Sequence, residues 1–299
     1  MGKRCQSPSS INTFKQCPRK YFYQYILKLP TSGSIHTVRG HIVHSVLEDF
    51  FDLPLDGMSK VNFKNLFHQH AERLLVHHWR GADKEIKDLK LATEELMNYF
   101  DETTMMLSNW VNKISEKIIK HPSAELSTSF KSLVPIREKH YMNHKFMVQG
   151  YMDAIEIIDG KVRVMDYKTS SRAHMSDEYR LQLAIYALLY HSEHGKAPDE
   201  VGIYFLKDAQ NFEQVIPVND EMIEKAKSEV EVIHLNTGSI QINDYPKREG
   251  PLCKWRTGQC DFYEVCFGQK SLEEFAPNVK LADGMMPANG TKVPNGSTH

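Results

Sequence analysis

The sequence predicts a mixed α/β fold in which helices flank a central mixed sheet, and two observations support this prediction. Three runs rich in β-branched and aromatic residues, at about 133–142, 146–158 and 161–169, follow one another closely, which is typical of antiparallel strands. A helical segment at about 176–193 then leads to a compact apolar run at 201–206, and a strand reached through a helix usually joins its sheet in parallel. The sheet should therefore contain both antiparallel and parallel pairs.

The helices that precede the strands are predicted from apolar spacing and from the residues that end them. A first helix is expected at 11–27, before Pro30, and a second at 38–51. The region 63–120 has a helical pattern throughout, with Gly81 as its one glycine. We expect this region to form an insertion or a lid.

A two-residue hairpin is predicted where Asp159-Gly160 joins two of the expected strands. In the register that this turn imposes, Asp153 should face Asp166. Two carboxylates this close repel each other unless a cation lies between them, and a divalent metal ion is the natural occupant. Lys168 lies two residues beyond Asp166, so its side chain should point to the same face.

This cluster of two acids and a lysine suits the hydrolysis of a phosphodiester. The metal ion would activate water and polarise a phosphoryl oxygen, while Lys168 would position the nucleophile or offset developing charge. The alternative is an exposed hairpin end with ordinary charges. We also expect the hairpin face that carries Ala154 and Glu156 to be wet, and the opposite face, with Ile155 and Ile157, to be apolar.

Composition narrows the class of protein. The chain has 299 residues, of which 41% are hydrophobic, so it can bury a sizeable core. It has no apolar run long enough to span a membrane and no signal peptide pattern, so we expect a cytoplasmic protein with no membrane partner. A formal net charge of −1 excludes a globally basic nucleic-acid binder, although a local basic patch could still bind DNA.

The helix expected at 11–27 mixes basic and aromatic residues, among them Arg19, Lys20 and Tyr21. This mixture suits a single-stranded nucleic acid, because cations attract phosphates and aromatic rings stack on bases. The alternative is that the aromatic residues belong to the protein core.

Five cysteines without an export signal indicate thiols kept for metal binding rather than disulfides. Cys253, Cys260 and Cys266 crowd one short segment, whereas Cys5 and Cys17 lie far upstream.

In their order along the chain, these motifs resemble those of the PD-(D/E)XK nuclease superfamily, and within it the RecB-like branch that includes the iron–sulfur exonucleases associated with CRISPR adaptation. The resemblance spans about residues 7–268. Five segments carry it, at 7–21, 40–48, 150–153, 165–169 and 182–186. It implies a restriction-endonuclease-like sheet flanked by helices, with a helical insertion and a C-terminal cysteine segment.

The resemblance also implies roles for individual residues. The implied ligands of Mg²⁺ or Mn²⁺ are His44, Asp153, Asp166 and the backbone carbonyl group of Tyr167. The implied catalytic residues are Asp153, Asp166, Lys168, Gln182 and Tyr186. Without the resemblance, His44 would be interpreted as an ordinary helix histidine, and His41 would be the rival candidate for a metal ligand. Gln182 and Tyr186 would be interpreted as an ordinary pair on a helix surface.

A [4Fe–4S] cluster is the second implied cofactor, with one cysteine ligand before the nuclease core and three after it. Cys17, Cys253, Cys260 and Cys266 reproduce this layout. The chain departs from the family where six residues, rather than the usual two, separate Cys253 from Cys260. Zinc on the same four sulfur atoms is the chemical alternative.

We expect six segments along the chain. They are an N-terminal helix with the first cluster cysteine (1–35), a histidine helix (36–62), a helical insertion (63–125), the nuclease core with a last helix at about 220–235 (126–245), the iron–sulfur cysteine segment (246–270) and a disordered tail (271–299).

The leading hypothesis is a metal-dependent DNA nuclease that acts on single strands or strand ends as an exonuclease, with a structural iron–sulfur cluster. The implied settings are DNA repair, recombination or CRISPR adaptation, and the implied partners are a helicase or an integrase-type protein. The alternatives are a weakly active or inactive nucleic-acid-binding subunit of a repair complex and a zinc-stabilised interaction protein. Cleavage polarity, endonuclease or exonuclease action and the choice of DNA or RNA stay open.

Overall fold

The computed structural model describes residues 4–170, 173–255 and 258–279. The chain divides into two compact units. The sheet unit comprises Gly33–Asn143 and Gln149–Ala226, and the cysteine unit comprises Met1–Ser32, His144–Val148 and Lys227–His299. Within the described residues, none of the helices combines the length and the apolarity that a membrane span requires.

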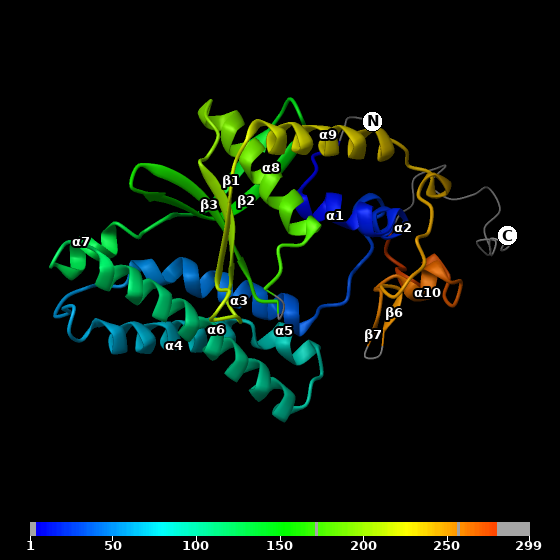
Figure 1. Ribbon diagram of the computed structural model, residues 1–299. Helices are drawn as coiled ribbons and strands as arrows, with labels where there is room; N and C mark the ends of the chain where they lie inside the picture. Colours follow the sequence, from blue (N-terminus) through cyan, green and yellow to red (C-terminus); the bar gives the residue numbers. More distant parts are fainter. Residues whose placement is uncertain (1–3, 171–172, 256–257, 280–299) are drawn as a thin grey trace. The chain divides into compact units, whose positions relative to one another are not determined.

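In the described residues, the main sheet has five strands in the order β1-β2-β3-β4-β5 (Figure 1). The strands are β1 Ile136–Asn143, β2 Val148–Ile158, β3 Lys161–Lys168, β4 Glu200–Phe205 and β5 Glu213–Pro217. β2 pairs with β3 and β4 with β5 in antiparallel fashion, whereas β3 and β4 are parallel. The predicted mixed sheet is confirmed, but β5 was not predicted because its five residues show no alternation between buried and exposed positions.

The predicted hairpin register is confirmed between β2 and β3. Ala154 pairs with Met165, and Ile158 pairs with Lys161. The turn residues Asp159 and Gly160 have φ angles of 51° and 77°, which is the left-handed conformation that a tight two-residue hairpin requires.

Helix α8, Asp177–His194, provides the connection that makes β3 and β4 parallel. Its first turn is capped by Ser176, whose side chain accepts a hydrogen bond from the backbone nitrogen of Tyr179. Its last turn ends at Gly195, which has a φ of 70° and therefore adopts a conformation that favours glycine. The helix thus begins and ends at fixed points, which sets the position of its side chains against the sheet.

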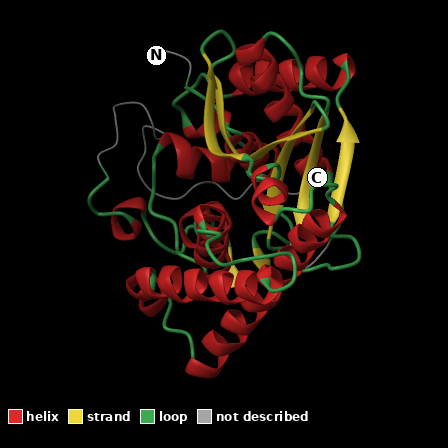
Figure 2. Cartoon of the chain, turned by 90° about the vertical axis from the view of Figure 1, so that its left-hand side faces the viewer, coloured by secondary structure: helices red, strands yellow, loops and turns green. Residues whose placement is uncertain are grey.

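A layer of helices precedes the sheet in the chain and packs against it (Figure 2). These helices are α3 Ile35–Asp49, α4 Phe63–Gly81, α5 Asp83–Asp88, α6 Thr93–Lys120 and α7 Leu126–Lys131, with a 3₁₀ turn at Phe50–Asp52. The large side chains of Phe50, Phe67 and Trp110 share one buried cluster with Ala154 and Met165 of the hairpin. The region expected to form an insertion or a lid is therefore a core layer.

This packing overturns the expectation that the hairpin face carrying Ala154 is wet. Ala154 and Met165 are fully buried, whereas Ile157, on the face expected to be apolar, is 61% exposed. The helical layer covers the first face, and strand alternation alone cannot reveal which face a distant helix will cover.

The first helix of the cysteine unit is shorter than predicted. α1, Pro8–Gln16, ends where the backbone of Cys17 becomes extended, with φ −158° and ψ 112°. Pro18 disfavours the helical conformation at the residue before it, so the chain breaks here and restarts as α2, Pro18–Tyr21, followed by a π-helical turn at Phe22–Ile26.

The remaining elements follow the sheet in the chain. They are α9 Asp220–Asn236, a 3₁₀ turn at Ile242–Asp244, the strand pair β6 Lys254–Trp255 and β7 Gly258–Gln259, α10 Tyr263–Cys266 and α11 Leu272–Phe275. α11 corrects the start of the expected disordered tail, because Ser271 and Glu274 form a capping box and Leu272 is buried. Residues 280–299 of that expected tail lie outside the described residues.

Candidate active site

The two aspartates lie on neighbouring central strands and are both buried. Asp153, on β2, is 8% exposed, and Asp166, on β3, is 2% exposed. Asp153 Oδ2 accepts a hydrogen bond of 2.7 Å from the backbone nitrogen of Tyr167, which ties its carboxylate to the β3 backbone. Carboxylates buried to this extent need cationic or hydrogen-bonding partners.

Those partners reach Asp166 from β3 and from α8. The Gln182 side chain donates from Nε2 to Asp166 Oδ1 at 2.8 Å and accepts at Oε1 from Lys168 Nζ at 3.0 Å. The Tyr186 hydroxyl group donates to Asp166 Oδ1 at 3.4 Å, and Gln182 Nε2 donates to that hydroxyl at 2.8 Å. Lys168 Nζ lies 2.7 Å from Asp166 Oδ2 and forms an ion pair with it. This oxygen atom is buried and accepts no hydrogen bond, so the ion pair is its compensating contact.

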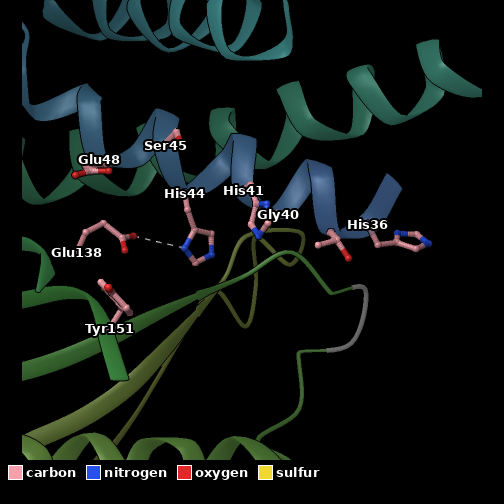
Figure 3. Close-up of a pocket in the computed structure, with 9 residues that line it drawn as sticks. His36, Gly40, His41, His44, Ser45, Glu48, Glu138 and Tyr151 are labelled. Carbon is pink, nitrogen blue, oxygen red and sulfur yellow. Dashed lines mark ion pairs between the residues drawn. The ribbon is translucent and has the colours of Figure 1, made fainter. Parts of the chain in front are cut away.

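His44 lies on α3 beside both strands. Its Nε2 donates to the carbonyl oxygen of Tyr167 at 3.1 Å, and its Nδ1 lies 3.4 Å from Asp153 Oδ1 and 3.8 Å from Glu138 Oε1. Figure 3 shows the Glu138 carboxylate directed at the His44 ring. One ligand atom from each of His44, Glu138 and Asp153 can be chosen so that all lie within 4.8 Å of one another.

Glu138 is the site residue that the sequence analysis missed. It lies in β1 with a φ of 44°, a left-handed conformation that is uncommon for a residue other than glycine. Its sequence context is a short run of charged residues without a motif, so it resembles any surface glutamate of an edge strand. Only its place beside His44 distinguishes it.

Two hollows border the cluster and both are lined by His36 and His44. The larger, about 580 Å³, is also lined by Glu48, Glu138 and Tyr151. The smaller, about 390 Å³, is also lined by Tyr167 and Lys168. A molecule in either hollow could therefore reach the reactive groups, which is the usual arrangement of a binding site.

Electrostatics favour positive charge at this place. Burial by itself would lower the pKa of His44, but hydrogen bonds to Asp153 and Glu138 and the charges of Asp153 and Asp166 raise it to about 10. Burial and then the charge of Asp166 raise the pKa of Asp153. The surroundings that hold a proton on His44 would equally attract a metal cation.

Lys168 remains charged in spite of its burial. Desolvation lowers the pKa of its ammonium group, but the charges of Asp166 and Asp153 outweigh this effect and raise it. Lys168 can therefore supply a fixed positive charge beside Asp166 at neutral pH.

The donor groups fit a hard divalent cation. Carboxylate and carbonyl oxygen atoms suit Mg²⁺, and one imidazole nitrogen is compatible with Mn²⁺. Of the expected ligands, the structure brings together His44, Asp153 and the carbonyl group of Tyr167. Asp166 lies outside the 4.8 Å group, because Lys168, Gln182 and Tyr186 hold its carboxylate.

The cysteines all lie in the cysteine unit and are free thiols, as expected. Burial raises the pKa of the Cys260 thiol and raises that of Cys266 to about 11, and the charge of Cys17 adds to both shifts. Cys253 is linked to Cys260 through a backbone hydrogen bond, Cys260 N to Cys253 O, of 2.9 Å. Among the described residues, no three of these sulfur atoms lie within 4.8 Å of one another, so their spacing exceeds that of a zinc tetrahedron.

The residues expected to contact nucleic acid are mostly buried in the same unit. Tyr21 is fully buried, with its hydroxyl group against Gln6, and Arg19 is 6% exposed and donates from Nε to the carbonyl oxygen of Tyr245 at 2.7 Å. Lys20 alone of the three expected residues is partly exposed. The structure therefore contradicts a direct role for Arg19 and Tyr21 in nucleic-acid binding, because both side chains belong to the core.

The family model described as the PD-(D/E)XK nuclease superfamily matches residues 6–267. The chain is 25% identical over 207 residues to an ATP-dependent helicase/deoxyribonuclease subunit of Clostridium perfringens strain SM101, an alignment that covers 62% of this chain and 18% of that protein. It is 38% identical over 220 residues to the Gene 69 protein of Mycobacterium phage D29, covering 67% of this chain and 74% of that protein.

A solved structure of a candidate exonuclease from Eubacterium rectale superimposes with a TM-score of 0.44 at 13% sequence identity, over 89% of this chain and 94% of that one. The chain thus spans about a fifth of the helicase/deoxyribonuclease subunits that it matches and most of the phage protein.

Proposed function

The chain belongs to the PD-(D/E)XK nuclease superfamily, as its motifs predicted, and from this premise we propose that it hydrolyses DNA with a divalent metal ion held by His44, Asp153, Asp166 and the carbonyl group of Tyr167. One observation carries the proposal. Gln182 joins Lys168 to Asp166, and this pair lies beside the contact between His44 and Asp153. A charged lysine, buried carboxylates and adjacent open hollows are together what phosphodiester hydrolysis needs.

The metal ion and the side chains of the site have different roles in the proposed reaction. Mg²⁺ or Mn²⁺, when bound, would supply an activated water and neutralise charge on the phosphate. Lys168 stays protonated next to Asp166 and offsets negative charge that develops on the phosphoryl oxygens, or orients the attacking water. Gln182 and Tyr186 hold the Asp166 carboxylate and so fix the direction of Lys168.

We propose DNA as the substrate, cut as a single strand or from an end. The name of the Clostridium perfringens relative, a helicase/deoxyribonuclease subunit, supports this substrate and supports a helicase as a partner over an integrase-type protein. The runner-up is a weakly active or inactive DNA-binding subunit, but the complete set of acids and lysine favours an enzyme.

We further propose that Cys17, Cys253, Cys260 and Cys266 hold a structural [4Fe–4S] cluster. Positive charges close to the thiols support it: Lys247 and Arg19 lower the pKa of Cys266, against the larger effect of burial, and would offset the negative charge of a cluster with four thiolates. Metal analysis of anaerobically purified protein tests this, and stoichiometric zinc without iron would refute it.

Cleavage of end-labelled single-stranded DNA with Mg²⁺ or Mn²⁺ tests the enzyme proposal. Wild-type protein should cut, Lys168→Ala should not, and the control Lys161→Ala should cut normally because Lys161 is an exposed residue at the hairpin turn. A substrate labelled at either end distinguishes the polarity. Wild-type protein that binds DNA but never cuts it would favour the inactive subunit.

A further inference from the structure

We propose that Glu138 is an additional side-chain ligand of the divalent cation, on the solvent side of the site. This inference rests on the proposed metal-dependent nuclease function. The motifs that carry the family resemblance do not include Glu138, so the inference depends on the structure alone.

A third candidate ligand, Glu138, lies next to the position that a cation bound by His44 and Asp153 would occupy. Glu138 Oε1 is 3.8 Å from His44 Nδ1, which in turn is 3.4 Å from Asp153 Oδ1. Ligand atoms of these residues gather within 4.8 Å, which is the spacing of groups around one ion. Figure 3 shows that Glu138 approaches His44 from β1, on the side of the larger hollow.

Exposure separates Glu138 from the aspartates. The side chains of Glu138 and His44 are each 30% exposed, whereas that of Asp153 is 8% exposed and that of Asp166 is 3% exposed. Asp166 is held by Lys168 and Gln182 on the buried side. Glu138 therefore supplies a carboxylate at the open side of the site, where a water molecule would otherwise complete the shell of a hard cation.

The backbone supports a functional role for Glu138. Its φ of 44° is sparsely populated for a residue with a Cβ atom, and such conformations persist where the surrounding structure imposes them, often at binding sites. The adjacent Arg137 anchors this part of β1, because its Nη2 lies 2.9 Å from Asp52 Oδ1 and its Nη1 donates to the carbonyl oxygen of Glu48. These contacts of Arg137 tie β1 to the end of α3 and to the 3₁₀ turn that follows it, and so hold Glu138 beside His44.

A simpler role for Glu138 would be to orient His44 by accepting a hydrogen bond. Glu138→Gln distinguishes the two roles, because the amide oxygen still accepts a hydrogen bond but lacks the negative charge of a ligand. Glu48→Gln is the matched control, since Glu48 lines the same hollow but lies outside the group of ligand atoms.

The experiment is calorimetric titration of Mn²⁺ into the full chain without DNA. Glu138→Gln should bind Mn²⁺ at least about tenfold more weakly than wild type, and Glu48→Gln should bind it as wild type does. Thermal unfolding without metal reports whether the variants fold. If Glu138→Gln fails to fold, Glu138→Asn replaces it, because asparagine tolerates the left-handed conformation.

Wild-type affinity in Glu138→Gln would overturn the inference, and so would an equal loss in both variants, which would reflect only the general charge of the hollow. If the wild-type protein cleaves DNA and binds Mn²⁺, and Glu138→Gln binds Mn²⁺ with the same affinity, this inference alone is refuted. Wild-type protein that binds no Mn²⁺ would refute the proposed function as well.

Discussion

Gln182→Leu tests whether the link between α8 and β3 serves catalysis. Leucine has a similar size but cannot hydrogen-bond, so the variant loses the hydrogen bonds from Gln182 to Asp166 and to the Tyr186 hydroxyl group, and the one from Lys168 to Gln182. Two of the three involve a charged partner. The Asp166 carboxylate would keep only the longer hydrogen bond from Tyr186, at 3.4 Å, together with the Lys168 ion pair.

The expected magnitude follows from those contacts. Hydrogen bonds to charged groups contribute roughly 1.5–3 kcal/mol each to stability, and we use the lower end because the half-buried leucine recovers part of the loss. The free energy of unfolding should therefore fall by about 3 kcal/mol. Lys168 would no longer be held in one direction, and a misplaced catalytic group lowers the rate by about 100-fold.

Two assays measure these effects. Urea unfolding followed by circular dichroism gives the change in stability, and cleavage of end-labelled single-stranded DNA at saturating metal gives kcat and KM. We expect kcat to fall while KM for DNA stays close to the wild-type value, because Gln182 positions Lys168 and does not bind DNA itself. Gln210→Leu, at an exposed position, is the control. A Gln182→Leu protein that is less stable but retains wild-type kcat would show that the link is only structural.

The other predictions concern pH, the cysteines and the sheet. The pKa of His44 is raised from 6.5 to about 10 in the folded, metal-free protein, so the stabilisation by protonated His44 is complete below pH 6.5 and is lost as the pH rises through about 10. In urea unfolding, the stability advantage of wild type over His44→Gln should therefore shrink over that pH range. A difference that stays constant with pH would contradict the assignment. Cys266→Ala should lower both iron content and melting temperature, and a stable variant with full iron would exclude Cys266 as a ligand. Gly202→Ala should destabilise the sheet by about 1–3 kcal/mol, because its Cβ atom would lie 2.7 Å from the Gln214 carbonyl oxygen, whereas Gly40→Ala, in a helix with open space around it, should be neutral or stabilising. Equal effects of the two glycine substitutions in urea unfolding would refute the packing argument.

Local signals in the sequence predicted how the residues of the β2–β3 hairpin are arranged. Asp159-Gly160 is a turn signal confined to two residues, so it predicted the register of β2 and β3 without knowledge of the rest of the fold. Lys168 could be placed on the Asp166 side because strand side chains alternate. The spacing of Gln182 and Tyr186 on one helix indicated that both could reach Lys168 or a phosphate, and in the structure Gln182 contacts Lys168 while both residues contact Asp166.

Other features depended on which distant segment covers a surface. The aromatic and basic residues near Tyr21 could equally serve a nucleic acid or a core, and the structure buries Tyr21, Phe22 and Tyr23 with Tyr245 and Phe262, more than 200 residues away in the chain. The hairpin face that carries Ala154 was expected to be exposed to solvent, but the helical layer covers it. The break at Cys17 was a local signal that the sequence analysis overlooked, because Pro18 alone disfavours a helix there.

The sequence alone determined the class of fold, the hairpin register and the lysine and carboxylates at its centre, because each of these follows from interactions between residues close together in the chain. The position of Glu138 beside His44 was decided by the tertiary structure. Two features distinguish its carboxylate from that of a surface glutamate, and no local pattern indicates either of them. One is the contact with His44 on α3, which lies more than 90 residues earlier, and the other is the left-handed backbone conformation. Long-range contacts of this kind form when the whole core packs, so the charged residues around Glu138 in the sequence do not indicate them.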